Sequence, residues 1–127
     1  EALRIDCDQG WLLVATDDED RPVGFAIFAL HEDEAHLEEI DVVPEHAGND
    51  LGRRLIHAVI AQTREAGLAR LTLTTFRDVP FNAPFYARLG FRIVDESLLP
   101  LRLARIRHEE RLNGCELAPR VAMILDV

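Results

Sequence analysis

The most informative stretch of this 127-residue chain joins a strand end, a proline and a glycine-containing loop that opens into a helix. In full it reads Val42-Val43-Pro44-Glu45-His46-Ala47-Gly48-Asn49-Asp50-Leu51-Gly52-Arg53-Arg54-Leu55. Such a turn presents several backbone N–H groups and the positive end of the helix dipole to one point in space. That arrangement binds phosphate or pyrophosphate. Gly48 and Gly52 also fit ordinary turn and packing residues, so this segment alone leaves both interpretations open.

Two adjacent acids, Glu38 and Glu39, interrupt the strand pattern just before that loop. Alternation from Leu37 would require an apolar residue at position 39, but the apolar positions resume only at Ile40 and Val42. This phase shift predicts a β-bulge at Glu38–Glu39. Two carboxylates at a strand kink do not both point into the core. They either serve a chemical purpose there or are two solvated acids on a strand edge.

A mixed series of strands and helices has to position these residues. Apolar runs and alternating patterns predict strands over Trp11–Ala15, Pro22–His31, Ala35–Pro44, Leu68–Phe76, Phe91–Asp95 and Pro119–Val127. Helical spacing predicts helices over Gly48–Gly67, Asn82–Leu89 and Leu99–Leu112. We therefore expect one mixed α/β (α+β) domain over residues 1–127, with helices covering a sheet.

The apolar positions also predict which side of each helix is buried. In the first helix, Leu51, Leu55, Ala58, Val59 and Gln62 share one side, and Gly67 is a natural stop. The last helix is interpreted as amphipathic, with a solvated face of arginines and glutamates or, as the alternative, a dimer contact. Its arginines are Arg102, Arg105, Arg107 and Arg111.

Composition narrows the class of function. The chain has 23 acidic and 14 basic residues and a formal net charge of −9, which argues against a nucleic-acid partner. No apolar run approaches the roughly 18 residues of a membrane span, and no signal peptide is recognised. The histidines and the cysteines Cys7 and Cys115 show no metal-ligand spacing, so no metal site is expected. A reducing cytoplasm is the simplest setting.

A second motif lies downstream, where Tyr86 stands four residues before Gly90-Phe91. Together with Val42-Val43-Pro44 and its loop, this motif makes about Trp11 to Asp95 resemble the GCN5-related N-acetyltransferase (GNAT) family. The resemblance implies a mostly antiparallel sheet flanked by helices, the acyl-CoA N-acyltransferase fold. It also implies acetyl transfer from acetyl-CoA to a primary amine of a small molecule or peptide, and pairing as a homodimer.

The resemblance assigns a coenzyme site to the strand end, the loop and the helix start. Its residues are Asp41, Val42, Val43, Ala47, Gly48, Asn49, Asp50, Leu51, Gly52, Arg53 and Asn82. Ala47 stands where the family has Gln or Arg, and Asp50 where it has Gly or Ala. Loss of a charge-assisted contact costs about 1–3 kcal/mol, so the two departures together weaken the site. Arg53 and Arg54 either compensate or are ordinary solvent-facing arginines.

The resemblance also assigns the catalytic roles. Glu38 takes the place of the general base, acting through water, with Glu39 or Asp41 facing the acceptor; His36 is an alternative base. Backbone N–H groups from Asp41 to Val43, left unpaired by the bulge, hold the thioester carbonyl. Tyr86 takes the place of the acid that protonates the leaving thiolate. For Asn82, capping of the short helix is favoured over a coenzyme contact.

Two hypotheses of function follow. The first is an acetyl-CoA-dependent N-acetyltransferase. The acidic pair and the negative net charge favour a cationic acceptor, such as a polyamine or an aminoglycoside. The second is an acetyltransferase-like domain whose impaired coenzyme site leaves it a binding or regulatory module. The family begins with a strand and one or two helices before the hairpin, and these helices form one wall of the acceptor site. Only Glu1 to Gly10 precedes the hairpin here, so we expect these first elements to be trimmed or the sheet shortened.

Overall fold

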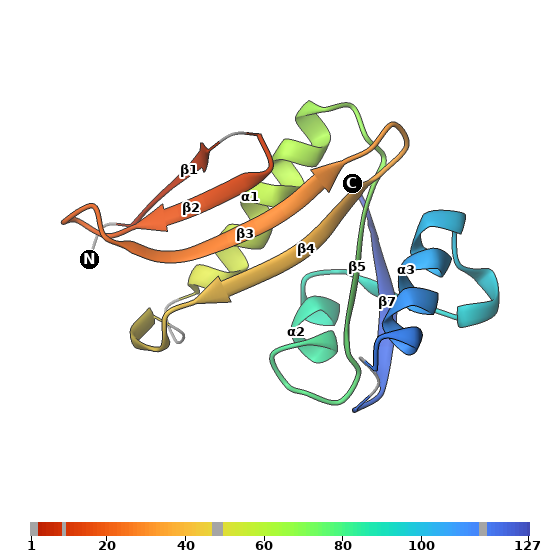
Figure 1. The fold of residues 1–127 in the computed structure, drawn as a ribbon. Helices are drawn as coiled ribbons and strands as arrows, with labels where there is room; N and C mark the ends of the chain where they lie inside the picture. Colours follow the sequence, from red (N-terminus) through yellow and green to blue (C-terminus); the bar gives the residue numbers. More distant parts are fainter. Residues whose placement is uncertain (1–2, 9, 47–49, 115–116) are drawn as a thin grey trace. The chain divides into compact units, whose positions relative to one another are not determined.

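The computed structural model describes residues 3–8, 10–46, 50–114 and 117–127, and over them the chain is a mixed α/β protein (Figure 1). Its strands are β1 (Arg4–Asp8), β2 (Leu12–Thr16), β3 (Pro22–Leu30), β4 (Ala35–Val42), β5 (Arg70–Phe76), β6 (Arg92–Val94) and β7 (Arg120–Asp126). Its α-helices are α1 (Leu51–Glu65), α2 (Ala83–Arg88) and α3 (Leu101–Leu112), with short 3-10 helices at Pro44–His46 and Glu96–Leu98. The predicted fold class is confirmed, and the chain divides into two compact units, Glu1–Leu71 with Val127 and Thr72–Asp126.

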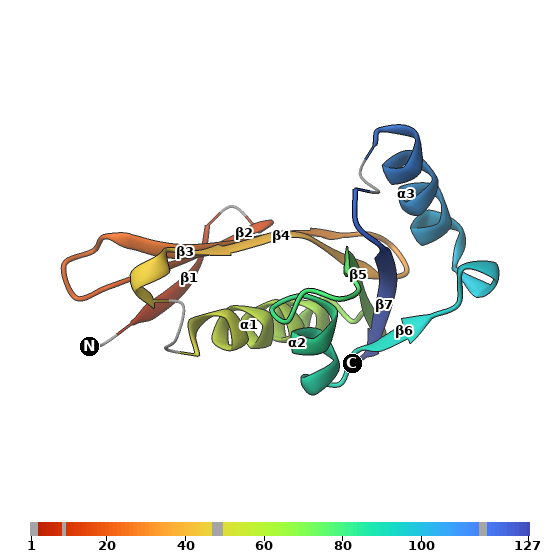
Figure 2. The ribbon, with the colours of Figure 1, turned by 90° about the horizontal axis from the view of Figure 1, so that it is seen from below.

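The first unit is an antiparallel meander of β1, β2, β3 and β4, in which each strand pairs with the next. Helix α1 packs against β2, β3 and β4 on one face of this meander (Figure 2). Leu13, Ala26 and Phe28 are buried on that face. Because strand side chains alternate between faces, the residues between them lie on the face away from α1.

Strand β1 is an element that the sequence did not predict, because no strand was assigned to Glu1 to Gly10. Arg4–Asp8 pairs along its whole length with β2. The hydrophobic pattern did not predict this strand, because its residues are mostly polar and exposed, as is common in an edge strand. Only three residues connect β1 to β2, which is too short for a helix. The described chain therefore has a strand before the hairpin and no helix between that strand and β2.

The bulge predicted at Glu38–Glu39 is confirmed. Ile27 pairs with Glu39 and the next residue, Phe28, pairs with Leu37, so Glu38 is the extra residue of β4. Side chains alternate between the two faces of the sheet on each side of such a bulge, but the alternation shifts by one residue across it. Leu37 is buried before the bulge, whereas Glu38 and Glu39 are both exposed.

Helix α1 is amphipathic, but its buried side is turned from the predicted one. The buried residues are Leu51, Leu55, Ile56, Val59, Ile60 and Thr63, and Ala58 and Gln62 are only partly buried. Gly67 adopts a φ of 75°, in the left-handed region that commonly ends a helix, as its position in the sequence predicted.

A buried ion pair ties the start of β4 to the start of β5. Glu34 is 1% exposed, and its Oε1 accepts from Arg70 Nε at 2.8 Å and lies 2.7 Å from Arg70 Nη2. The backbone N–H of Val127 donates to the carbonyl of Ala69 beside this pair in the chain. A buried carboxylate is tolerated only when such donors compensate for its lost hydration.

In the second unit β7 lies between β5 and β6, and Leu103, Ala122 and Ile124 form a buried hydrophobic cluster. The interpretation of α3 as carrying a wholly solvated arginine face is wrong for one residue, because Arg107 is 3% exposed. Arg107 donates to Glu96 and Glu110, each at 2.9 Å. Carboxylates from two elements therefore hold this buried guanidinium, and the residue type alone did not predict that burial.

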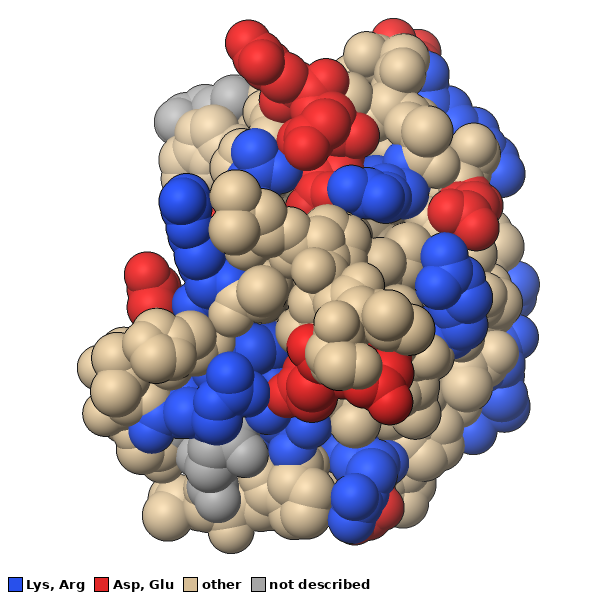
Figure 3. Space-filling model, turned by 90° about the vertical axis from the view of Figure 1, so that its right-hand side faces the viewer, with Lys and Arg blue, Asp and Glu red and all other residues tan. Residues whose placement is uncertain are grey.

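Exposed and partly buried charges of the chain also form ion pairs. Figure 3 shows a face on which basic and acidic side chains are interspersed. Ion pairs such as Arg111–Glu96 at 3.1 Å and Arg120–Glu110 at 3.1 Å come from this second unit. The arginines of these pairs are therefore partnered within the chain.

Gly24 generates a prediction about stability. A Cβ built at Gly24 would lie 3.1 Å from the backbone oxygen of Asp41, 3.2 Å from Leu51 Cδ2 and 3.3 Å from Leu55 Cδ1. We expect Gly24→Ala to lower the free energy of unfolding by about 1–3 kcal/mol through overpacking, measured by urea denaturation. In Gly24→Ala combined with Leu55→Ala, the loss should be smaller than the sum of the single losses. Strict additivity would show that the close approach carries no strain.

Candidate functional site

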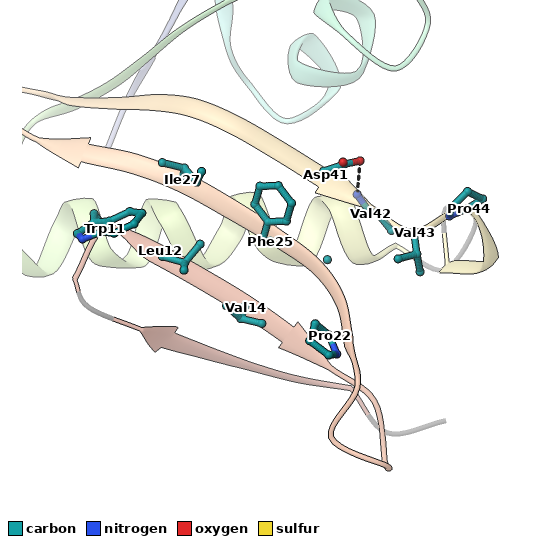
Figure 4. A pocket seen from close by; sticks show the side chains of 11 residues that line it. Trp11, Leu12, Val14, Pro22, Phe25, Ile27, Asp41, Val42, Val43 and Pro44 are labelled. Carbon is teal, nitrogen blue, oxygen red and sulfur yellow. Dashed lines mark hydrogen bonds between the residues drawn. The ribbon is translucent and has the colours of Figure 1, made fainter.

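A pocket of about 630 Å³ lies in the first unit, on the face of the meander that points away from α1 (Figure 4). It is lined by Trp11, Leu12, Val14, Pro22, Gly24, Phe25, Ile27, Asp41, Val42, Val43 and Pro44. Most of these side chains are apolar, and Asp41 is the one acid among them. Small-molecule sites are usually apolar cavities of about 300–1,000 Å³ with a few placed polar groups, so this pocket has the size and character of one.

Two cross-strand rows build the floor of this pocket. Leu12 lies opposite Ile27, which lies opposite Glu39. In the next row Val14 lies opposite Phe25, which lies opposite Asp41. Residues directly opposite one another in an antiparallel pair share a face and bring their Cβ atoms to about 4.5–5.5 Å. Each row therefore runs from apolar side chains to a carboxylate on β4.

The apolar members of these rows were not singled out from the sequence as functional. A signal for them exists, because the runs Trp11–Ala15 and Pro22–Leu30 are apolar on both faces rather than alternating. One face of an antiparallel sheet is commonly solvated and polar. A second apolar face therefore indicates a surface that something covers.

The strand end corrects the prediction of unpaired backbone donors. The N–H of Val43 donates to the carbonyl of Val23 on β3 at 2.9 Å. The N–H of Val42 points to the opposite edge of the strand, because successive N–H groups alternate, and it donates to Oδ1 of Asp41 at 2.9 Å (Figure 4). Asp41 is exposed, so a competing acceptor has to displace only a solvated side chain to reach Val42.

Asp50 begins the helix in a conformation that suits glycine. Its φ is 60° and its ψ is 9°, in the left-handed region, and its side chain makes no capping hydrogen bond. This accounts physically for the Gly of the family pattern at this position. The carboxylate of Asp50 instead pairs with Arg53, at 2.7 Å, and this partner lowers the pKa of Asp50. The neighbouring Ala47, Gly48 and Asn49 lie outside the described residues.

The first turn of α1 still offers backbone donors. The first intrahelical bond runs from the N–H of Arg54 to the carbonyl of Asp50, so the N–H groups of Leu51, Gly52 and Arg53 precede it. The two arginines of this turn differ. Arg53 neutralises Asp50, whereas Arg54 donates to the carbonyl of Leu3 at 3.1 Å.

The candidate bases are distributed unequally between solvent and core. Glu38 and Glu39 are exposed on β4, Glu39 on the pocket face. His36 is 7% exposed and lies opposite Ala29, before the bulge. A base that receives a proton from a substrate needs access to it, so the exposed carboxylates fit this task better than His36.

Tyr86 and Asn82 belong to the second unit. Tyr86 is 6% exposed and packs edge-on against Phe85 and Phe91, with ring centroids 5.2 Å and 5.6 Å away. Burial raises the pKa of its hydroxyl to about 12. Asn82 occupies the N-cap position of α2, but its side chain makes no capping bond, which corrects that interpretation. Its Oδ1 accepts from the hydroxyl of Thr75 at 2.6 Å.

With this geometry in hand, comparison with known proteins identifies the family. The model of the Acetyltransferase (GNAT) family matches residues 1–91. The chain belongs to this family, and the resemblance inferred from the two motifs is confirmed. The family transfers acetyl groups, and acetyl-CoA is its acyl donor.

Solved structures share the fold at low sequence identity. N-acetylglutamate synthase from Neisseria gonorrhoeae, complexed with coenzyme A and N-acetyl-glutamate, is similar with a TM-score of 0.73 and 18% identity, over 98% of this chain and 29% of the synthase. The ribosomal-protein-S18-alanine N-acetyltransferase from Escherichia coli gives 0.70 and 23%, over 91% and 68%. The PaiA N-acetyltransferase from Thermoplasma acidophilum, in complex with coenzyme A, gives 0.66 and 17%, over 91% and 60%.

Neither a membrane-spanning helix nor a metal site is present among the described residues. None of the helices in this part of the chain combines the length and the apolar character needed to cross a membrane. Nor do three or more His, Cys, Asp or Glu side chains come together here in a group that could hold a metal ion.

The ionisation of Tyr86 can be measured directly, because it is the one tyrosine of the chain. The phenolate absorbance of the folded protein should rise with a midpoint near pH 12, and that of the urea-unfolded chain near pH 10. Because the pKa of Tyr86 is higher in the folded state, its contribution to the free energy of unfolding is fully present below pH 10. That contribution, about 2–3 kcal/mol, is lost as the pH rises through 12.

Tyr86→Phe is the control for both measurements. It should show no phenolate signal and should lose less stability between pH 10 and pH 12. A midpoint near pH 10 in the folded protein would mean that the hydroxyl is solvated rather than buried.

Proposed function

We propose that this protein is an N-acetyltransferase that transfers an acetyl group from acetyl-CoA to a primary amine of a small molecule or peptide by direct attack. The observation that carries the proposal is the bulge of β4 in a chain of this family. The bulge leaves the carboxylate of Glu38 exposed on β4. The end of the same strand, two residues beyond Ile40, presents the N–H of Val42.

Acetyl-CoA would be held at the strand end and the helix start. The donors that fit it are the N–H of Val42 for a carbonyl oxygen and the N–H groups of the first turn of α1 for pyrophosphate. Asp50 is the unfavourable element, since a carboxylate there repels an anion. Its ion pair with Arg53 offsets that charge, so the helix start carries a neutral pair rather than a lone negative group.

The chemistry then needs three groups. Glu38 accepts a proton from the ammonium of the acceptor, directly or through water, which leaves a neutral amine. The nitrogen forms a bond to the thioester carbonyl carbon while Val42 donates to the oxygen. The carbon–sulfur bond then breaks to release the thiolate, and the nitrogen gives its remaining excess proton to water as the amide forms. Asp41 has to release the N–H of Val42 for this contact to form.

Tyr86 is the proposed partner of the departing sulfur. Its pKa of about 12 lies well above that of a thiol, which is about 8.5, so complete proton transfer to a thiolate is unfavourable. A hydrogen bond from the neutral hydroxyl stabilises the thiolate without that transfer. The hydroxyl therefore acts as a donor, and water supplies the final proton. A homodimer and a cytoplasmic location remain predictions of the sequence.

Calorimetric titration with acetyl-CoA tests the coenzyme site. Asp50→Gly removes a negative charge and suits a φ of 60°, so we expect about threefold to tenfold tighter binding than in the unaltered protein. Asp20→Gly is a matched control, because Asp20 also has a positive φ, 59°, and pairs with an arginine, Arg4. The control should leave the affinity unchanged.

The outcomes separate the two functions. Binding by the unaltered chain supports the enzyme and justifies a search for its acceptor. Absence of binding in the unaltered chain, with binding restored in Ala47→Arg combined with Asp50→Gly, would instead identify a domain whose coenzyme site is switched off. An equal gain in Asp20→Gly would show that net charge, rather than the helix start, controls the affinity.

Thiol release from acetyl-CoA across a panel of amines tests the catalytic role of Glu38. Glu38→Gln keeps the shape of the side chain but removes its basicity, so kcat should fall by about 100-fold or more with the acetyl-CoA affinity unchanged. Glu65→Gln, at an exposed acid of α1, serves as the control and should leave kcat as it is. Full activity in Glu38→Gln would assign the proton transfer to another group.

A further inference from the structure

The floor of the pocket is apolar where a solvated sheet face would be polar. Leu12, Val14, Phe25 and Ile27 point from β2 and β3 to the face away from α1, and each is only partly buried (Figure 4). Trp11 adjoins them and is 47% exposed. A contiguous apolar surface that remains accessible marks a binding site for an apolar group.

The rim of the same floor is acidic along β4, where Asp41 lines the pocket and Glu39 lies outside its lining on the same face. Glu39 and Asp41 end the two cross-strand rows, and both are exposed. Their carboxylates therefore lie within one side-chain length of Ile27 and Phe25. A ligand that matches this surface has an apolar body and one cationic end placed at the β4 side.

Asp41 connects this surface to the proposed reaction. One of its carboxylate oxygens already accepts from the N–H of Val42, the group assigned to the thioester oxygen. A cation held by Asp41 would consequently lie beside the acetyl group. This step rests on the proposed function, whereas the shape and charge of the pocket do not.

We propose that the acceptor is a primary monoamine with an apolar body, an alkyl or arylalkyl amine. The body lies on Leu12, Val14, Phe25 and Ile27 beside Trp11, and the ammonium lies between Glu39 and Asp41. A short diamine is selected against, because its second ammonium would have to leave water for the apolar floor. This class of acceptor is narrower than the cationic acceptors, polyamines among them, that the net charge alone favours.

Trp11 makes binding measurable without the coenzyme, because it is the one tryptophan of the chain and lines the pocket. Titration of its fluorescence with n-alkylamines from butylamine to octylamine should give dissociation constants that fall about fourfold for each added CH₂ until the floor is covered. The alcohols of equal length should bind more weakly than the amines. Pentane-1,5-diamine should bind more weakly than pentylamine.

Two charge variants test the rim. Asp41→Asn and Glu39→Gln should each weaken amine binding by about twofold to fivefold and leave alcohol binding unchanged. Asp18→Asn is the matched control, because Asp18 is an exposed acid of the turn between β2 and β3 that belongs to neither cross-strand row. It removes the same charge and should change neither.

The failures are distinguishable. Equal binding of amines and alcohols, or of diamine and monoamine, would overturn the proposal, as would affinities that do not depend on chain length. Thiol release from acetyl-CoA is measured separately on the same amines. Amines that bind as expected but release no thiol would refute the acetyltransferase activity and leave the pocket standing. Diamines acetylated as fast as monoamines of equal length would refute the pocket and leave the activity standing.

Discussion

The β-bulge at Glu38 determines which face of the sheet each later residue of β4 occupies. Without the extra residue, the alternation from Leu37 would turn Glu39 and Asp41 towards α1 and would turn Ile40 and Val42 away from it. Two carboxylates would then be buried against a helix with no compensating donors, at a cost of several kcal/mol. The inserted residue reverses this arrangement, so that the partly buried Ile40 and Val42 turn towards α1, and Glu39 and Asp41 turn to the face that carries the pocket.

Gly24 then fixes the strand end and the helix start to each other. The space that its missing side chain leaves is shared by the backbone oxygen of Asp41, by Leu51 at the first residue of α1 and by Leu55 one turn later. The two sets of backbone donors proposed for acetyl-CoA, at Val42 and in the first turn of α1, are thus positioned by one close approach. A rigid separation between donors is what lets an extended ligand contact both without ordering the protein at each end.

The sequence predicted those features that one residue type or one break in a pattern specifies. A charged residue where alternation required an apolar one located the bulge, and Gly67 located the end of α1. Features that depend on which strand or side chain meets a residue in the folded chain were missed. Strand β1 is polar and is recognised only by its pairing with β2, and Arg107 is buried because carboxylates surround it. Asn82 bonds to Thr75 instead of its own helix for the same reason.

The acidity of the site has two separate physical consequences. At the helix start, Asp50 opposes an anionic ligand, and Arg53 at 2.7 Å cancels most of that effect locally. At the strand end, Asp41 has no described cationic partner and turns to the N–H of Val42 instead. An ammonium that approaches Asp41 offers it a stronger partner than a neutral N–H, since it adds the attraction of a full opposite charge to the hydrogen bond. In the proposed reaction, transfer of Asp41 to the ammonium frees the N–H of Val42 for the thioester oxygen. The same carboxylate then links the binding of an amine to the exposure of the proposed donor to that oxygen.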